Sequence, residues 1–197
     1  MRGKVWENEK SPKKTGEALM TRFKDRIIRA AKIDVNLYEE VEADKGAFGQ
    51  AMGVVVLSSI AAGIGSIERA WLSGMVMGTI TALISWFVWA YLTYLIGTRF
   101  LPEPQTKADY GELLRTIGFA SAPGLIRVLG IIPGLRWIVF LGASIWMLVA
   151  TVVAVRQALD YKSTFRAIGV CIIGWIIQAL IFALLFSLVG GCGRSFS

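Results

Sequence analysis

Residues Ala167–Val189, with the sequence AIGVCIIGWIIQALIFALLFSLV, decide the fold class of this chain. The stretch holds no charged side chain over 23 residues. A hydrocarbon layer about 30 Å thick is crossed by about 20 mostly apolar residues in an α-helix. A buried helix of a soluble protein stays apolar for only about 10–14 residues. The stretch is therefore predicted to span a membrane.

Four other segments have the same character. Three are long enough to span on their own: Ala47–Ile67, Trp71–Gly97 and Leu135–Val155. The fourth, predicted over residues 115–132, is shorter and is interrupted at Pro123. With residues 167–189 they predict an all-α fold, in which residues 47–189 form a polytopic membrane bundle of five transmembrane helices preceded by a cytoplasmic amphipathic helix.

Composition supports this class and excludes much chemistry. Hydrophobic residues make up 55% of the chain and the mean hydropathy is +0.58, both too high for an ordinary soluble domain. The sequence contains no histidine, which excludes an imidazole base, a Ser–His triad and a histidine metal site. Cys171 and Cys192 lack the spacing of a zinc site, and Cys171 is predicted to pack as a small apolar residue. We predict no catalytic residue, no metal and no cofactor.

Lysine and arginine are unevenly distributed between the loops. Eleven of the 21 precede Ala47, whereas the turn after the first span has only Arg69 and the tail has only Arg194. Cytoplasmic loops carry the excess of basic residues, so the N-terminus is predicted to be cytoplasmic. Five crossings then place the short tail, residues 190–197, outside. The net charge of +7 is interpreted as a topology signal and not as a sign of nucleic-acid binding.

The segment before the first span has three parts. Residues 1–16 are charged and poor in apolar residues, which predicts disorder. Residues 17–46 are predicted to form an amphipathic helix followed by a solvated acidic linker that contains Glu39, Glu40, Glu42 and Asp44. Beside the apolar stripe of this helix lies a basic flank, made of Arg22, Arg26, Arg29 and Lys32. Either the flank binds anionic lipid, or the stripe packs onto the ends of the spans and the charges face water.

Small residues recur at four-residue spacing within the first two spans. The pairs are Gly49–Gly53, Ser59–Gly63 and Gly74–Gly78. Such spacing lets two membrane helices approach closely. We predict that Gly49, Gly53, Gly74 and Gly78 serve helix packing, either inside a compact bundle or on one face available for self-association.

The third span combines a proline with a charge. Pro123 inside an apolar run predicts a kinked helix, and Arg127 follows about one turn later. A charged residue near membrane depth faces the bundle interior or extends to the interface. Pro123 and Arg127 therefore form either a binding site for an anionic ligand or headgroup, or a kink whose arginine reaches the outer interface.

Six short motifs lie before, within and between the predicted spans. They are RAAKID at residues 29–34, YEEV at 38–41, YGELLR at 110–115, GFASAP at 118–123, AVRQALD at 154–160 and TFRAI at 164–168. By the residues of these motifs and their order along the sequence, the chain resembles the Yip family, the Ypt/Rab-interacting membrane proteins, in its prokaryotic form. The resemblance implies five spans, a cytoplasmic N-terminus, no enzymatic activity and, for a prokaryotic member, the plasma membrane.

The resemblance also bears on partners. Eukaryotic members of the family bind prenylated Rab-type GTPases through an acidic-Leu-Tyr-Gly-Pro motif, in whose place this chain has Asn36-Leu37-Tyr38-Glu39-Glu40. Three functions are therefore considered. The first is a non-enzymatic scaffold or accessory subunit bound to other membrane proteins or to itself. The second is a membrane-organising protein that binds anionic lipid or a GTPase through its N-terminal segment. The third is a small-molecule or lipid transporter that uses the kinked third span.

Overall fold

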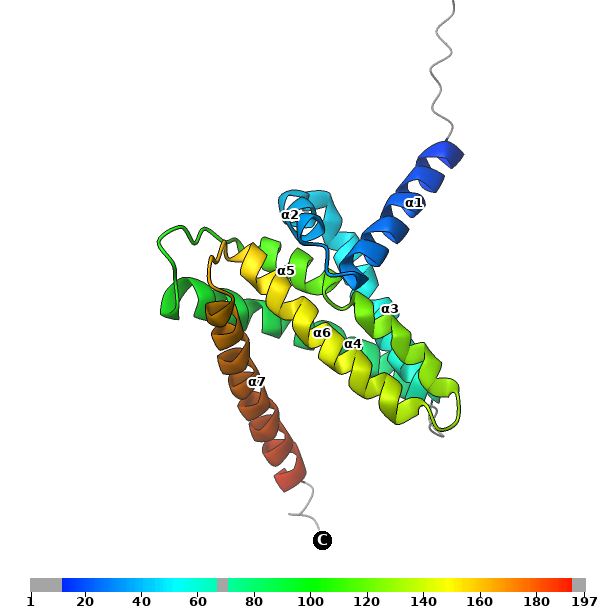
Figure 1. The fold of residues 1–197 in the computed structure, drawn as a ribbon. Coiled ribbons are helices and arrows are strands. Elements are labelled where there is room, and N and C mark those ends of the chain that lie inside the picture. Colours follow the sequence, from blue (N-terminus) through cyan, green and yellow to red (C-terminus); the bar gives the residue numbers. More distant parts are fainter. Residues whose placement is uncertain (1–11, 67–70, 193–197) are drawn as a thin grey trace, which may run out of the picture.

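The structure, a computed structural model, describes residues 12–66 and 71–192, and every regular element in these ranges is helical (Figure 1). Two helices and a short turn precede the spans: α1 (Pro12–Ala31), α2 (Val35–Ala43) and η1 (Lys45–Ala47). The spans are α3 (Phe48–Ser66), α4 (Trp71–Leu95) with the π-helical turn η2 (Ile96–Phe100), α5 (Tyr110–Phe119) with the 3-10 helix η3 (Ala122–Ile131), α6 (Arg136–Ala158) and α7 (Thr164–Cys192). Five segments are long and apolar enough to cross a membrane, so the predicted all-α membrane bundle of five spans is confirmed.

The third span lies at the centre of the bundle. In its candidate membrane segment, 61% of the residues are buried, against 22–33% in the other four. The span is interrupted, where the sequence predicted a kinked helix. α5 ends at Phe119, and Pro123 lies in the first turn of η3. Backbone N–H groups in a first turn have no partner within the helix, so proline loses no hydrogen bond there. The chain therefore crosses the membrane as two short helices in series.

The third span and α3 approach closely at small residues. The two segments meet at three pairs, Ala51–Gly118, Ser58–Gly124 and Gly65–Gly130. On α3 the members are seven residues apart, which is two turns of an α-helix. Within η3, Gly124 and Gly130 are six apart, which matches two turns of a 3-10 helix at three residues per turn. The 3-10 winding therefore keeps both of these glycines facing α3.

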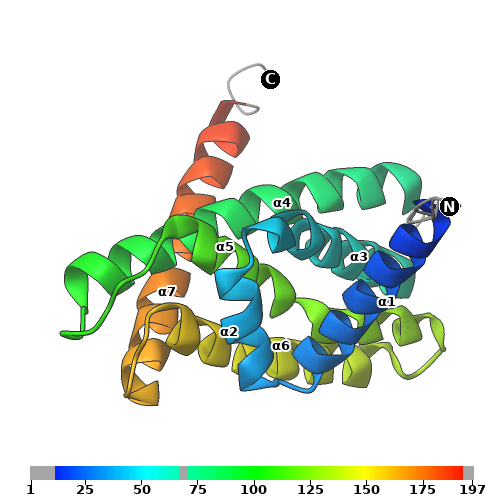
Figure 2. The ribbon, with the colours of Figure 1, turned by 90° about the horizontal axis from the view of Figure 1, so that it is seen from above.

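α2 is a packed helix at the end of the bundle where α3 begins, where the sequence predicted a solvated linker. Leu37, Tyr38 and Val41 are fully buried. Viewed from above, α2 lies over α5 and α6 (Figure 2). The buried Arg115 of α5 donates hydrogen bonds to the carbonyl oxygens of Val41 and Glu42, which compensates the negative C-terminal end of α2.

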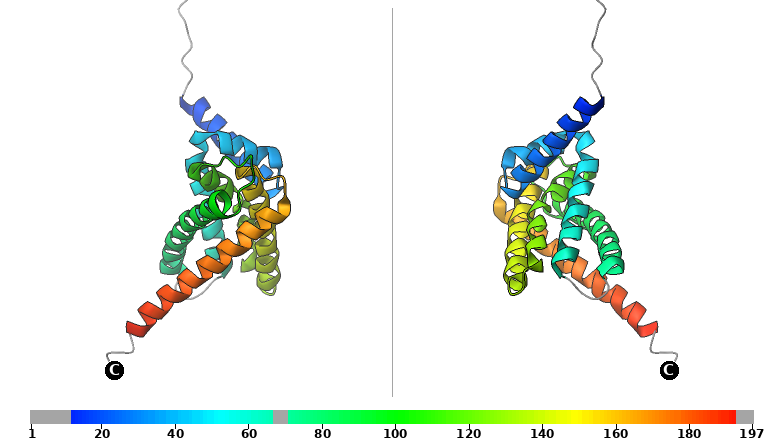
Figure 3. Two further views of the ribbon diagram at one scale, coloured as in Figure 1. Left: turned by 90° about the vertical axis from the view of Figure 1, so that its left-hand side faces the viewer. Right: turned by 90° about the vertical axis from the view of Figure 1, so that its right-hand side faces the viewer.

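α7 diverges from the other spans. At the twelfth of its 29 residues, Trp175, α7 stacks on Trp89 of α4 with 5.7 Å between ring centroids. The C-terminal half then extends away from α3 and α6 (Figures 1 and 3). Leu180 and Leu184 are 64% and 61% exposed. This half therefore depends on lipid or on another helix to cover its surface.

Two predicted boundary segments differ from the observed helices. α1 begins at Pro12, inside the segment predicted to be disordered, because proline is favourable at a first helical position. Residues 1–11 lie outside the described residues. α7 continues to Cys192, inside the predicted tail, and residues 193–197 again lie outside the described residues.

Candidate functional site

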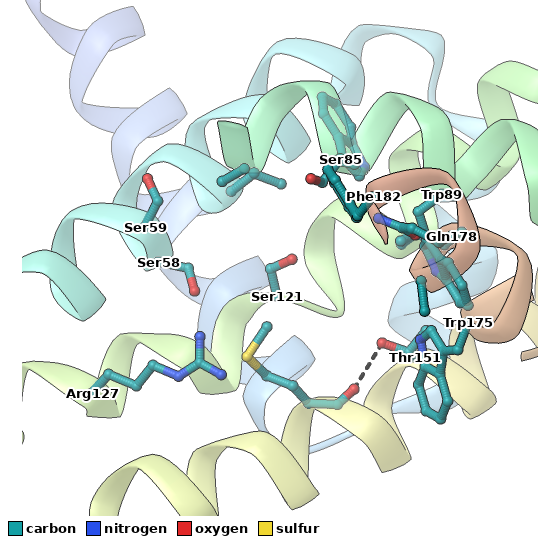
Figure 4. Close-up of a pocket in the computed structure, with 16 residues that line it drawn as sticks. Ser58, Ser59, Ser85, Trp89, Ser121, Arg127, Thr151, Trp175, Gln178 and Phe182 are labelled. Carbon is teal, nitrogen blue, oxygen red and sulfur yellow. Dashed lines mark hydrogen bonds between the residues drawn. The ribbon is translucent and has the colours of Figure 1, made fainter. Parts of the chain in front are cut away.

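A cavity of about 420 Å³ lies beside the break in the third span and is lined by residues of α3, α4, the third span, α6 and α7. It is at mid-depth, because Ser58 is the eleventh of the 19 residues of α3 and Gln178 is the fifteenth of the 29 of α7. Its walls carry five hydroxyl groups, those of Ser58, Ser59, Ser85, Ser121 and Thr151. An amide and a guanidinium, from Gln178 and Arg127, complete the polar lining (Figure 4).

Arg127 extends into this cavity. In Figure 4 its side chain runs back along η3 toward Ser121, in the direction that Cα–Cβ bonds take on a helix. The guanidinium donates from Nη2 to the Oγ of Ser144 at 3.2 Å and lies 5.7 Å from the centre of the Phe140 ring. Its Nε is buried without a hydrogen-bond partner. The carbonyl oxygen of Arg127 lies beside Gly65, the eighteenth of the 19 residues of α3, so both alternatives for Arg127, a binding site and a side chain that reaches the outer interface, stay predictions.

No carboxylate of the described residues compensates the charge of Arg127. Within the ranges 12–66 and 71–192 no carboxylate pairs with it; the contacts are a hydroxyl and an aromatic face. A charged side chain at membrane depth costs about 2.5–3.5 kcal/mol on insertion scales. The neutral contacts offset only part of this cost, because a cation–π contact contributes about 0.5–2 kcal/mol.

The other polar groups of the cavity differ in their bonding. Ser59 donates to the carbonyl oxygen of Val56 at 2.8 Å, and Thr151 donates to that of Met147 at 2.8 Å. In contrast, four groups make no hydrogen bond with any part of the chain that the structure describes: Ser58, Ser85, Ser121 and Gln178. Ser58 is only 4% exposed. Ser85, Ser121 and Gln178 are partly exposed, so a ligand in the cavity can reach these groups.

Two residues of the basic flank of α1, Arg26 and Arg29, lie in an ion-pair network with acids before, within and after α2. Arg26 is 1% exposed and donates to Oε1 of Glu40 at 2.9 Å and 2.7 Å, to Oδ2 of Asp44 at 2.8 Å and to Oε1 of Gln50 at 2.8 Å. Arg29 bonds the other oxygen of Glu40 at 2.7 Å and Oδ2 of Asp34 at 2.8 Å. We call these residues the α1–α2 network. Sequence reasoning placed its acids in a solvated linker and so missed it.

The network determines the ionisation of its acids. Hydrogen bonds from Arg29 and Arg26 hold the pKa of Asp34 and of Asp44, respectively, below its usual value. Burial opposes ionisation of Glu40, but hydrogen bonds from Arg26 and Arg29 outweigh it and lower its pKa. All three are therefore ionised at neutral pH, and Arg26 is not exposed to a headgroup.

The apolar stripe of α1 packs partly on the spans. Ala30 is fully buried, and Phe23 comes within 3.5 Å of the position of a β-carbon on Gly53. This placement agrees with the packing that the second alternative described, but the charges do not all face water as it stated, because Arg26 is 1% exposed. Lys32 is exposed and Arg22 is 57% exposed at its side chain, so lipid binding by these two residues stays a prediction.

Residues 39–189 match the family of the Yip1 domain. The chain belongs to the Yip1 family. The resemblance read from the sequence is thereby confirmed, and the five apolar helices make this Yip1-family chain a multi-pass integral membrane protein. The match begins inside α2, so α1 precedes the matched domain. Among curated proteins and among solved structures nothing matches the chain.

The small-residue pairs of this Yip1-family protein have different surroundings. Ser59 and Gly63 lie between α3 and α4: Ser59 bonds Thr79 at 3.0 Å, and a β-carbon on Gly63 would lie 2.6 Å from Met75. A β-carbon on Gly49, Gly74 or Gly78 would meet nothing within 4 Å. Gly74 and Gly78 are exposed on α4. These three glycines therefore do not pack the described spans against one another.

Acidic residues gather between α2, α5 and α6. Around a second cavity of about 300 Å³ lie Glu39, Glu42, Glu112 and Asp160. Burial raises the pKa of Glu42 to about 7, and the negative charges of Glu112, Asp160 and Glu39 add to this effect. The positive charge of Arg115 acts in the opposite direction and lowers the pKa. In the described ranges no group of three or more side chains is arranged to hold a metal ion.

Glu42 is expected to make stability depend on pH between about 5 and 8. The pKa of Glu42 is higher in the folded state than the value near 4.5 of the unfolded chain. Its contribution to stability is therefore fully present below about pH 4.5 and is lost as the pH rises through 7. The change is expected to be on the order of 1 kcal/mol, since solvent screens a partly exposed group. Thermal unfolding of Glu42→Gln across this range should lose the slope. Asp25→Asn, at an exposed carboxylate, should keep it, and an unchanged slope in Glu42→Gln would contradict the assignment.

Proposed function

We propose that this protein is a non-enzymatic scaffold or accessory subunit that holds another transmembrane helix against α4. The observation that carries the proposal is the vacant, outward-facing pair Gly74–Gly78. Two glycines four residues apart remove the side chains that keep helix backbones apart, and such pairs are typical of helix association in membranes. The Ser59–Gly63 pair already serves this purpose between α3 and α4, whereas no described part of the chain occupies the Gly74–Gly78 face.

The residue types of the sequence and of the described cavity support the non-enzymatic part of this proposal. The sequence contains no histidine, and the described helices hold no cluster of metal ligands. Cys171 is buried at 1% exposure among apolar side chains and is not placed as a nucleophile. The polar groups of the mid-depth cavity are hydroxyls, an amide and a guanidinium, which bind ligands and include no general base.

We also propose a topology for this scaffold. α1, α2 and the connections at residues 101–109 and 159–163 lie at one end of the bundle (Figures 1 and 3). The basic residues are concentrated at this end, which supports a cytoplasmic N-terminus and an external C-terminus in a prokaryotic plasma membrane.

The test is the size of the native assembly after gentle extraction. We expect the wild-type protein to migrate as a defined complex, and Gly74→Leu with Gly78→Leu to weaken that complex about tenfold or more, because the leucines separate the helices. Gly142→Leu is the matched control, since Gly142 of α6 is also exposed with nothing within 4 Å. A wild-type protein that is strictly monomeric and retains no partner, or a complex indifferent to the double substitution, would refute the proposal.

A specific observation favours a second candidate, a membrane-organising role of the N-terminal half of α1. Leu19 and Met20 are 54% and 59% exposed beside the exposed Arg22, an arrangement that suits an anionic membrane surface. The GTPase alternative has less support, because Leu37 and Tyr38, in the segment that replaces the family's cytoplasmic motif, are fully buried. The transporter alternative depends on the mid-depth cavity, because a transporter must first bind its ligand there.

A further inference from the structure

We infer that the mid-depth cavity binds an anionic lipid, whose phosphate pairs with Arg127 and whose acyl chain leaves along α7. This site is separate from the Gly74–Gly78 face and does not depend on the scaffold role. It is built from four observations: an uncompensated cation, unpaired neutral donors, a location at mid-depth and a lateral opening.

The cation requires an anionic partner. Arg127 faces the cavity with no carboxylate paired to it in the part of the chain that the structure describes, and its buried Nε makes no hydrogen bond. A guanidinium presents several donors in a planar fork that matches a phosphate or carboxylate. An arginine at membrane depth that faces a cavity is by default a binding group.

The neutral donors face the same space. Ser58, Ser121, Ser85 and Gln178 line the cavity and have no hydrogen-bond partner in the described chain. Ser121 is free because it precedes η3 without capping it by a side-chain hydrogen bond. Phosphate has several acceptor oxygens, so it can accept from Arg127 and from these groups together. A hydrocarbon ligand alone would leave all of them unsatisfied.

The position and shape of the cavity favour a lipid over a free anion. Its volume of about 420 Å³ is within the range of about 300–1,000 Å³ for small-molecule sites. On the α7 side the wall is apolar, formed by Trp175, Ala179 and Phe182, and Phe182 is 44% exposed. The C-terminal half of α7 diverges from α3 and α6 (Figure 3), so an acyl chain can extend from the cavity along α7 into the membrane. A free anion would have to reach mid-depth without a chain to anchor it.

The test compares lipids that remain bound to the full-length protein in native mass spectrometry. The probes are dioleoyl phosphatidic acid, dioleoyl phosphatidylcholine and inorganic phosphate. We expect phosphatidic acid to bind about tenfold or more tightly than phosphatidylcholine, and Arg127→Gln to remove most of that preference, because a charge-assisted hydrogen bond contributes about this much. Arg127→Lys should restore part of it. Arg99→Gln, at an exposed arginine near the end of the second span, should leave it unchanged.

Several outcomes would overturn the inference. They are equal retention of the two lipids, a preference unaffected by Arg127→Gln, and inorganic phosphate displacing phosphatidic acid at equal concentration, which would indicate a small-anion site. If Arg127→Gln does not fold, the Ala179→Phe variant is used to test the site instead. Ala179 is exposed on α7, so a larger side chain is tolerated there but fills the lateral opening. A correctly folded Ala179→Phe variant that retains phosphatidic acid like the wild type would refute the site.

Discussion

Replacing Gly65 with alanine is expected to destabilise the folded protein by about 3 kcal/mol, the upper end for an overpacked core site. A β-carbon at this position would lie 1.9 Å from the carbonyl oxygen of Arg127 and 3.1 Å from the ring of Phe140. Because the nearest atom belongs to the backbone, no side-chain rotation relieves the contact. α3 must move away from η3, and this movement loosens the row of small-residue contacts along the central span.

The measurement is unfolding of the detergent-solubilised protein, followed by helicity during denaturation. Gly142→Ala is the control, because it makes the same change in a membrane helix where a β-carbon meets nothing within 4 Å. Any gain in helix propensity is then common to both variants. If Gly65→Ala unfolds like Gly142→Ala, the close approach of α3 and η3 is not present in the folded protein.

Arg26→Met is expected to destabilise the protein by about 2–3 kcal/mol, in the range for losing charged hydrogen bonds of a buried group. The variant keeps much of the volume of the side chain but removes its bonds to Glu40, Asp44 and Gln50. It also leaves Glu40 and Asp44 facing the same space without the cation between them. Arg29 still compensates Glu40, which keeps the loss below that of a fully stranded charge.

Arg22→Met provides the comparison for this effect. Arg22 approaches the same two acids at 3.7 Å, but its side chain is 57% exposed, so we expect a loss of less than about 0.5 kcal/mol. Both variants can be measured by thermal unfolding at low and high salt. The Arg26→Met loss should persist at high salt, because water is excluded around Arg26. Equal losses in the two variants would mean that Arg26 is not enclosed by α2.

The sequence by itself determined the class and the number of the membrane helices. Inside a bilayer the backbone has no water to bond, so an apolar run such as Ala167–Val189 must form a helix, whatever surrounds it. The same local rule located the break near Pro123, because proline cannot continue a helix. It did not specify the 3-10 winding of η3, which keeps Gly124 and Gly130 facing Ser58 and Gly65 across the interface with α3.

Only the tertiary structure decided which residues face one another. Four-residue spacing selected Ser59–Gly63, which does pack α3 against α4, and Gly74–Gly78, which contacts no described span. The contacts of α3 with the third span are made at Gly118 and other small residues that no local pattern distinguishes. Arg26 belongs to a basic stripe by spacing, yet its partners are 14 and 18 residues away on the next helix and turn. A helix forms because each backbone N–H and C=O group finds its hydrogen-bond partner within a few residues. Burial and ion pairing depend instead on which surfaces, distant in the sequence, pack against one another.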